Sequence, residues 1–250
     1  MNKSAQFNLI SHFLEIRKRV LYCLITFSVV ALPCIVFAKE LFETTTAWFF
    51  FPLPRDYTFI ATEVTSTFVI PLKLALFATL FCVAPFILYQ GWAFITPGLY
   101  AHEKRHLRIS FIASVGLFYV GAAFAYFLVC PLALQFFIGQ APSNVHVMTD
   151  LSHYLNFIIK MILSFGIGFQ VPIIIFLSLQ AGICSIQSLK NKRRYIIVLA
   201  FVLGMLLTPP DVISQVLLAL PMIALFELGI ISYTLFGHST CTKLRNTNAP

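Results

Sequence analysis

Charged side chains are scarce in this sequence. Only 10% of its 250 residues are Asp, Glu, Lys or Arg, whereas 59% are hydrophobic and the mean hydropathy is +0.89. A soluble globule needs more polar side chains than this to cover its surface. The composition therefore excludes a soluble domain and indicates an integral membrane protein.

Acidic residues and paired cysteines are also lacking. The chain has 9 acidic and 17 basic residues, for a net charge of +8, but the bases fall in the gaps between apolar runs. A nucleic-acid-binding protein gathers its bases on one face of a soluble domain, so we expect no nucleic-acid partner. No CxxC spacing occurs among the six cysteines, which favours small apolar residues over disulfides or a metal site. We expect no metal or other cofactor.

The apolar runs predict an all-α protein with six transmembrane helices. The predicted spans cover residues 20–37, 68–92, 109–132, 154–179, 195–207 and 212–236. An amphipathic head at residues 1–19 suits the membrane surface, and a polar tail follows at residues 237–250. The basic head and first run imitate a secretory signal, but this apolar run exceeds the usual signal core, so we expect it to be retained. The whole of residues 1–250 is predicted to be one membrane domain.

Two features predict irregular helices. Pro71, Pro85 and Pro172 lie inside predicted spans, where proline removes a backbone hydrogen bond and bends the helix. The fifth span, at residues 195–207, is only about 20 Å long as a helix, against about 30 Å of hydrocarbon. We therefore predict curved or kinked helices and a short final pair of spans. The turn between the last two is formed by Thr208, Pro209, Pro210 and Asp211, where Asp211 can cap the next helix.

The positions of the bases predict the orientation. All but four of the 17 Lys and Arg residues lie in the head, the loop after the second span, the loop after the fourth span and the tail. By the positive-inside rule these segments are cytoplasmic, so both termini are predicted to be cytoplasmic. The segment at residues 39–67 is then an outer loop, which its prolines and threonines predict to be ordered but irregular.

Five separate stretches of the sequence resemble one family. They are SHFLEIRKR in the head, IATEV in the first outer loop, FILYQGWAFITPGLYAHEKR, FYVGAAFAYF and GMLLTPPDVISQ. In these stretches the chain is similar to the TatC family, the multispanning receptor subunit of the twin-arginine protein translocase. The resemblance implies a non-enzymatic protein of the bacterial inner membrane that exports folded proteins bearing twin-arginine signal peptides, using the proton-motive force. It also implies single-span partners like TatA and TatB, and homo-oligomers within a receptor complex in the lipid membrane.

The same resemblance implies a binding surface for the signal peptide. Carried over, Glu103 binds one arginine, Glu15 supports the second, Phe94 and Tyr100 flank the peptide, and Arg17 belongs to the same surface. The chemistry is suitable, because a carboxylate accepts the planar guanidinium fork in a bidentate manner that lysine cannot match. The alternative is that the two glutamates only neutralise neighbouring bases, as surface acids usually do.

A second set of residues is implied in binding partner helices. Gln170 is an amide inside an apolar span, where the family often has an acid, so it keeps hydrogen bonding but loses a titratable proton. It either binds a polar group of a partner or makes a hydrogen bond inside the subunit. Met205, Leu206 and Thr208 match the region that binds partner helices, although the first two are equally typical of ordinary packing.

The sequence departs from the family in the first outer loop. Trp48 stands where Pro is frequent, and Thr67 where Pro is common. An alternative function is a six-span secondary transporter, which Lys160, Gln170 and the proline-broken spans favour. The chain lacks the two-half repeat symmetry and the acidic cluster at mid-membrane that such a transporter would need.

Overall fold

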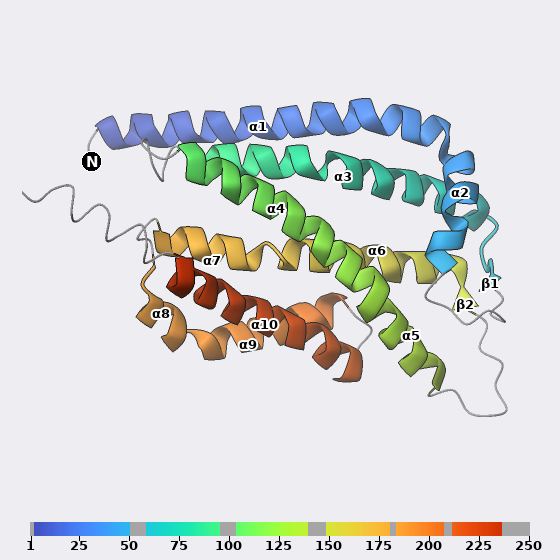
Figure 1. Cartoon of the computed structure of the whole chain (residues 1–250). Coiled ribbons are helices and arrows are strands. Elements are labelled where there is room, and N and C mark those ends of the chain that lie inside the picture. The colour runs from blue at the N-terminus through green and yellow to red at the C-terminus, as the bar shows by residue number, and fades with distance from the viewer. Residues whose placement is uncertain are drawn as a thin grey trace, which may run out of the picture. The chain divides into compact units, whose positions relative to one another are not determined.

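The structure is a computed structural model that describes residues 3–50, 59–95, 104–139, 149–180, 184–207 and 212–236. Apart from two strands of two residues each, its elements are helices (Figure 1), so the predicted all-α class is confirmed. Four helical segments in the described part are long and apolar enough to cross a membrane: Leu14–Val36, Ser66–Phe94, Ser110–Phe137 and Leu151–Leu179. The chain divides into two compact units, one of which contains the first three helices and the start of the fourth.

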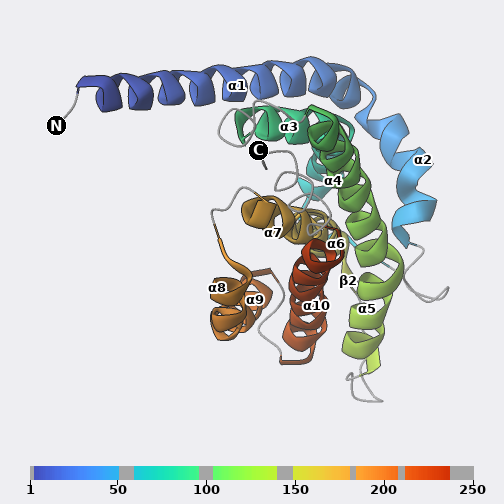
Figure 2. The ribbon, with the colours of Figure 1, turned by 60° about the vertical axis from the view of Figure 1, so that its left-hand side comes forward.

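The first unit is built on α1 (Lys3–Val36), α2 (Ala38–Phe50) and α3 (Ser66–Ile95). Helix α1 lies along α3, and α2 turns away from the end of α1 to pack on α3 (Figure 2). Helical hydrogen bonds continue across the bend, because the Phe37 amide donates to Pro33 and the Leu41 amide to Phe37. The predicted head and first span are thus one uninterrupted helix.

Helix α2 corrects the prediction of an irregular loop over residues 39–67. Residues 38–50 are helical because their threonines, which were interpreted as a sign of irregular backbone, bond to the preceding turn. The Thr44 hydroxyl donates to the Glu40 carbonyl at 2.8 Å, and that of Thr45 to Leu41 at 2.6 Å. Glu40 lies in the first turn, where a negative charge favours the helix dipole. Trp48 lies in this helix and is exposed.

A polar contact closes the other end of the first unit. Strand β1 (Phe59–Ile60) pairs with β2 (Thr149–Asp150). The Asp150 carboxylate accepts hydrogen bonds from the Thr62 amide at 3.1 Å, the Thr62 hydroxyl at 2.6 Å and the Ser152 amide at 2.8 Å. Asp150 therefore caps the helix that follows it and ties that helix to the segment after β1.

The predicted third and fourth spans are helices with local breaks. The third consists of α4 (Lys104–Phe124), a π-helical turn η2 (Ala125–Val129) and α5 (Cys130–Gly139). The fourth consists of α6 (Leu151–Gly168) and α7 (Val171–Gln180), separated at residues 169–170. Pro172 explains this break, because it has no N–H with which to bond the Gly168 carbonyl. By contrast, α3 is one helix through both of its prolines.

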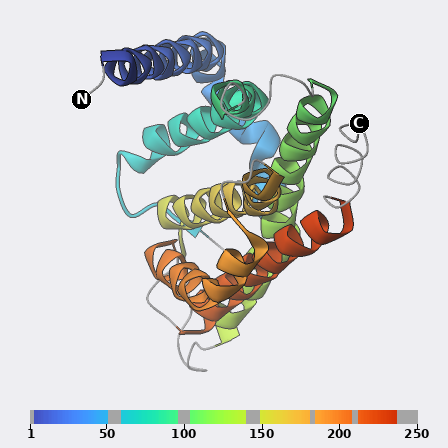
Figure 3. The ribbon, with the colours of Figure 1, turned by 90° about the vertical axis from the view of Figure 1, so that its left-hand side faces the viewer.

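The second unit packs α7 and α9 on α10 (Figure 3). After the short helix α8 (Ile186–Asn191), α9 (Arg193–Leu207) and α10 (Val212–Phe236) end and begin where the sequence predicts. Helix α9 has 15 residues, and the continuous apolar part of α10 is Ala219–Thr234. The core between α7 and α10 is formed by buried side chains, namely Ile175, Leu179, Phe226 and Ile230.

Candidate functional site

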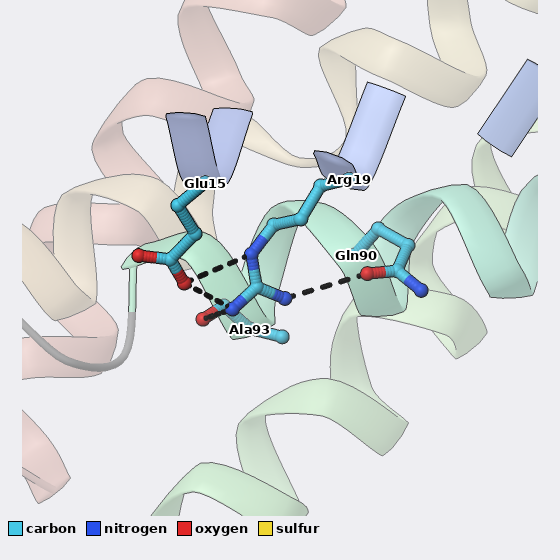
Figure 4. A network of polar contacts seen from close by, with 4 residues as sticks. All are labelled: Glu15, Arg19, Gln90 and Ala93. Carbon is cyan, nitrogen blue, oxygen red and sulfur yellow. Dashed lines mark hydrogen bonds and ion pairs between the residues drawn. The ribbon is translucent and has the colours of Figure 1, made fainter. Parts of the chain in front are cut away.

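Arg19 joins α1 to α3 through its guanidinium group (Figure 4). On its own helix it donates to one oxygen of Glu15, from Nε at 3.2 Å and from Nη2 at 2.5 Å. Across to α3 it donates from Nη1 to the Gln90 side-chain oxygen at 3.3 Å and from Nη2 to the Ala93 carbonyl at 2.8 Å. We call Glu15, Arg19, Gln90 and Ala93 the Arg19 cluster.

The cluster fixes the position of a partly exposed carboxylate. The side chains of Arg19 and Glu15 are 22% and 36% exposed, so solvent weakens their ion pair, but the fork geometry still orients both groups. Both bonds from Arg19 go to Oε1 of Glu15. Oε2 makes no hydrogen bond to any residue within the described ranges, so it can accept one from a cationic group outside the chain.

A groove between α1 and α3 begins at this cluster. Its volume is 620 Å³, and its lining is formed by residues of the two helices: Ile16, Arg19, Val20, Cys23, Leu24, Phe27, Ile87, Gln90, Gly91 and Phe94. The polar side chains in this lining are Arg19 and Gln90, both in the cluster. The site therefore combines an oriented carboxylate with an adjoining apolar surface.

The structure brings together two of the residues predicted to bind the signal peptide. Glu15 belongs to the cluster, and Phe94 lines the groove beside Arg19. Arg17 lies on α1 and is exposed. Glu103 and Tyr100 lie outside the described residues, so their predicted roles stay predictions.

The residues predicted to bind partner helices are only partly described. Gln170 lies at the break between α6 and α7 and is 9% exposed, which favours the internal of its two predicted roles. Met205 is exposed on α9. Leu206 is in the same helix, and only its backbone is described. The predicted turn, Thr208, Pro209, Pro210 and Asp211, lies outside the described residues.

Two polar contacts hold the hairpin of α9 and α10. The Gln215 side-chain amide donates to the Phe201 carbonyl at 2.9 Å, and Arg193 pairs with Glu227 at 2.7 Å. The Arg193 partner gives Glu227 a role that the sequence analysis did not assign. No group of His, Cys, Asp or Glu that could hold a metal ion occurs in the described part of the chain.

Sequence reasoning missed Arg19 and Gln90 as site residues. Arg19 was only one of several bases in the head, but its spacing of four residues from Glu15 is that of a helical ion pair. Gln90 is an amide near the end of an apolar span, the same kind of signal that singled out Gln170. Their meeting depends on the packing of α1 against α3, which no local pattern encodes.

The comparisons with known proteins agree with this arrangement. A family model described as Sec-independent protein translocase protein (TatC) matches residues 11–221. The chain belongs to the TatC family. The TatC protein of Escherichia coli strain K12 is 48% identical over 222 residues, which are 89% of this chain and 86% of that protein. The TatC protein of Haemophilus influenzae is 45% identical over 223 residues, 89% of this chain and 87% of its own.

A solved TatC structure has the same fold. The crystal structure of the twin-arginine translocase receptor TatC superposes with a TM-score of 0.80 at 36% identity, and the match covers 90% of this chain and 98% of that chain. Family and fold together identify the chain as a membrane component of a Sec-independent protein translocase.

Proposed function

We propose that this chain is the receptor subunit of a twin-arginine translocase and binds signal peptides that carry two consecutive arginines. The observation that supports this most directly is the oriented Glu15 carboxylate, one oxygen of which is held by Arg19. Its second oxygen can accept a hydrogen bond from an arginine of the peptide. In this proposal Glu103 binds the other arginine, and Phe94, Tyr100 and Arg17 complete the surface.

The wider proposal follows the family. The two units form one domain of the bacterial inner membrane, with six spans and both termini in the cytoplasm. The subunit works in homo-oligomers with single-span partners like TatA and TatB, and the proton-motive force drives export of folded proteins. Met205, Leu206 and Thr208 contact the partner helices, and Pro209, Pro210 and Asp211 form the turn beside them. The exposure of Met205 on α9 supports this assignment.

Site-specific photocrosslinking tests the receptor role. A photoreactive amino acid at position 94 is expected to crosslink to a twin-arginine signal peptide in membranes and not to the same peptide with two lysines. Lysine keeps the charge but lacks the planar fork, so the difference reports recognition of arginine geometry. The control probe is at Val36, which is exposed near the other end of α1 and is expected to give no crosslink that depends on arginine.

A negative result at position 94 would refute the receptor proposal, provided that the protein is inserted normally. A substrate-dependent ion flux through the purified protein would then favour the secondary transporter. Glu103→Ala provides an independent test: export of twin-arginine precursors is expected to stop while the amount of inserted protein stays normal. Unchanged export would remove Glu103 from the site.

A further inference from the structure

The groove that starts at the Arg19 cluster has no role in the function proposed so far. Helix α1 forms one wall and α3 the other, and the polar side chains of the lining lie at the end that also holds Phe94. Val20 and Leu24 in this lining are 50% and 56% exposed, although they are large apolar side chains. The groove is therefore an amphipathic surface: an oriented carboxylate at one end, followed by an apolar channel.

The length of the groove selects the kind of ligand. Ile16 and Phe27, the first and last lining residues on α1, are eleven positions apart, about 17 Å along a helix. Signal peptides consist of a positively charged segment followed by an apolar one of about 7–15 residues. Such a segment is about 10–22 Å long as a helix, so the groove accommodates it along its length.

The charges at the groove end favour a cationic ligand over a phospholipid headgroup. Among the lining residues only Arg19 is charged, and its guanidinium is engaged by Glu15, Gln90 and Ala93. A phosphate entering here would meet the Glu15 carboxylate and would find the nearest cation already paired. A ligand with arginines at one end and an apolar segment behind them matches both parts of the surface.

We propose that the groove between α1 and α3 binds the apolar segment of the signal peptide, with its arginines held at the Glu15 end. This inference rests on the proposed receptor function and extends it: the arginines identify the precursor, and the groove reads the apolar segment that follows. Cys23 and Gly91, which face each other's helices across the lining, then contact the ligand.

Gly91 offers a substitution that fills the groove. A Cβ built at this position meets no atom of the chain within 4 Å, so a larger side chain enters open space and displaces none of its own neighbours. The matched control is Gly116 on α4, which also has nothing within 4 Å of its Cβ and is outside the groove lining. We expect Gly91→Leu to weaken binding of a fluorescent twin-arginine signal peptide to the purified protein about tenfold or more. Gly116→Leu is expected to bind as the unmodified protein does.

Disulfide crosslinking locates the apolar segment directly. One variant keeps Cys23 as its only cysteine, and a control keeps only Cys34, which is on the same helix outside the groove. The peptide has two arginines and one cysteine in the middle of its apolar segment. With a copper–phenanthroline oxidant, we expect a disulfide at Cys23 and none at Cys34. Moving the peptide cysteine ahead of the arginines is expected to abolish the product at Cys23.

The outcomes separate the groove from the receptor role. If position 94 crosslinks in an arginine-dependent manner but Cys23 does not, and if Gly91→Leu binds normally, the groove assignment is wrong and the receptor stands. Such a groove would be covered by lipid. If the arginine-dependent crosslink at position 94 is itself missing, the receptor proposal fails, and the groove assignment fails with it.

Discussion

A substitution at Gly121 tests the packing of α4 against α6 in the second unit. A Cβ at Gly121 would lie 2.7 Å from the carbonyl oxygen of Phe165 and 2.7 Å from Cγ of Phe169. Neither obstacle is the far end of a flexible side chain, so Gly121→Ala must push the two helices apart. Gly116, five residues earlier on α4, meets nothing within 4 Å and serves as the control.

The expected difference follows from two opposing terms. Alanine is better than glycine inside a helix by about 1 kcal/mol, and this gain applies at both positions. Overpacking costs about 1–3 kcal/mol, or more where backbone must move, and applies only at position 121. Gly116→Ala is therefore expected to be neutral or slightly stabilising. Gly121→Ala is expected to be less stable than Gly116→Ala by about 2–3 kcal/mol, the overpacking cost alone.

Thermal unfolding in detergent, followed by tryptophan fluorescence, measures this difference. For a chain of this size about 1 kcal/mol corresponds to about 2–4 °C, so Gly121→Ala should unfold at least about 4 °C below Gly116→Ala. Equal midpoints would refute the close approach of the two helices at Gly121. A third variant, Gly168→Ala, refines the comparison because its obstacle is the flexible Met222 side chain, so a smaller loss is expected.

Three further predictions concern other parts of the chain. Gln170→Leu is expected to reduce export and thermal stability while signal-peptide binding stays intact, because it removes the hydrogen-bonding side chain at the break between α6 and α7. If export and co-purification of partner are unchanged, Gln170 has only a packing role. Arg193→Gln and Glu227→Gln, alone and together, should give a coupling energy below about 1 kcal/mol, because the pair is 47% and 35% exposed. A larger coupling would mean that lipid shields the pair from water. Elemental analysis is expected to find no stoichiometric metal in the purified protein.

The sequence predicted the parts of the fold that depend on local chemistry. The bounds of α9 and α10 were nearly correct, because proline at 209 and 210 cannot continue a helix. The break near Pro172 has the same cause. Helix α2 was missed because threonine is as typical of irregular backbone as of a helix in which its hydroxyl bonds to the turn before. The π-helical turn at Ala125–Val129 has no signal in the sequence that we could identify.

The candidate site was predictable only in part. Glu15 and Phe94 were found through the resemblance, and the structure shows that they lie at one end of the same groove. Arg19 and Gln90 are 71 positions apart, and their hydrogen bond exists only once α1 and α3 have packed. The groove itself is a gap between two apolar surfaces, and the same residues would fit a closed interface equally well on paper.

Helix α1 has a consequence for the order in which this protein is assembled in the membrane. Only 6% of the apolar window within Leu14–Val36 is buried, compared with 33% to 44% in the other three long segments. Lipid is as apolar as these side chains, so little hydrophobic energy holds α1 to its neighbours once it has been inserted. The first helix to leave the ribosome is thus able to span the membrane alone, and its attachment must wait for α3. The polar contacts of Arg19 mark that second event.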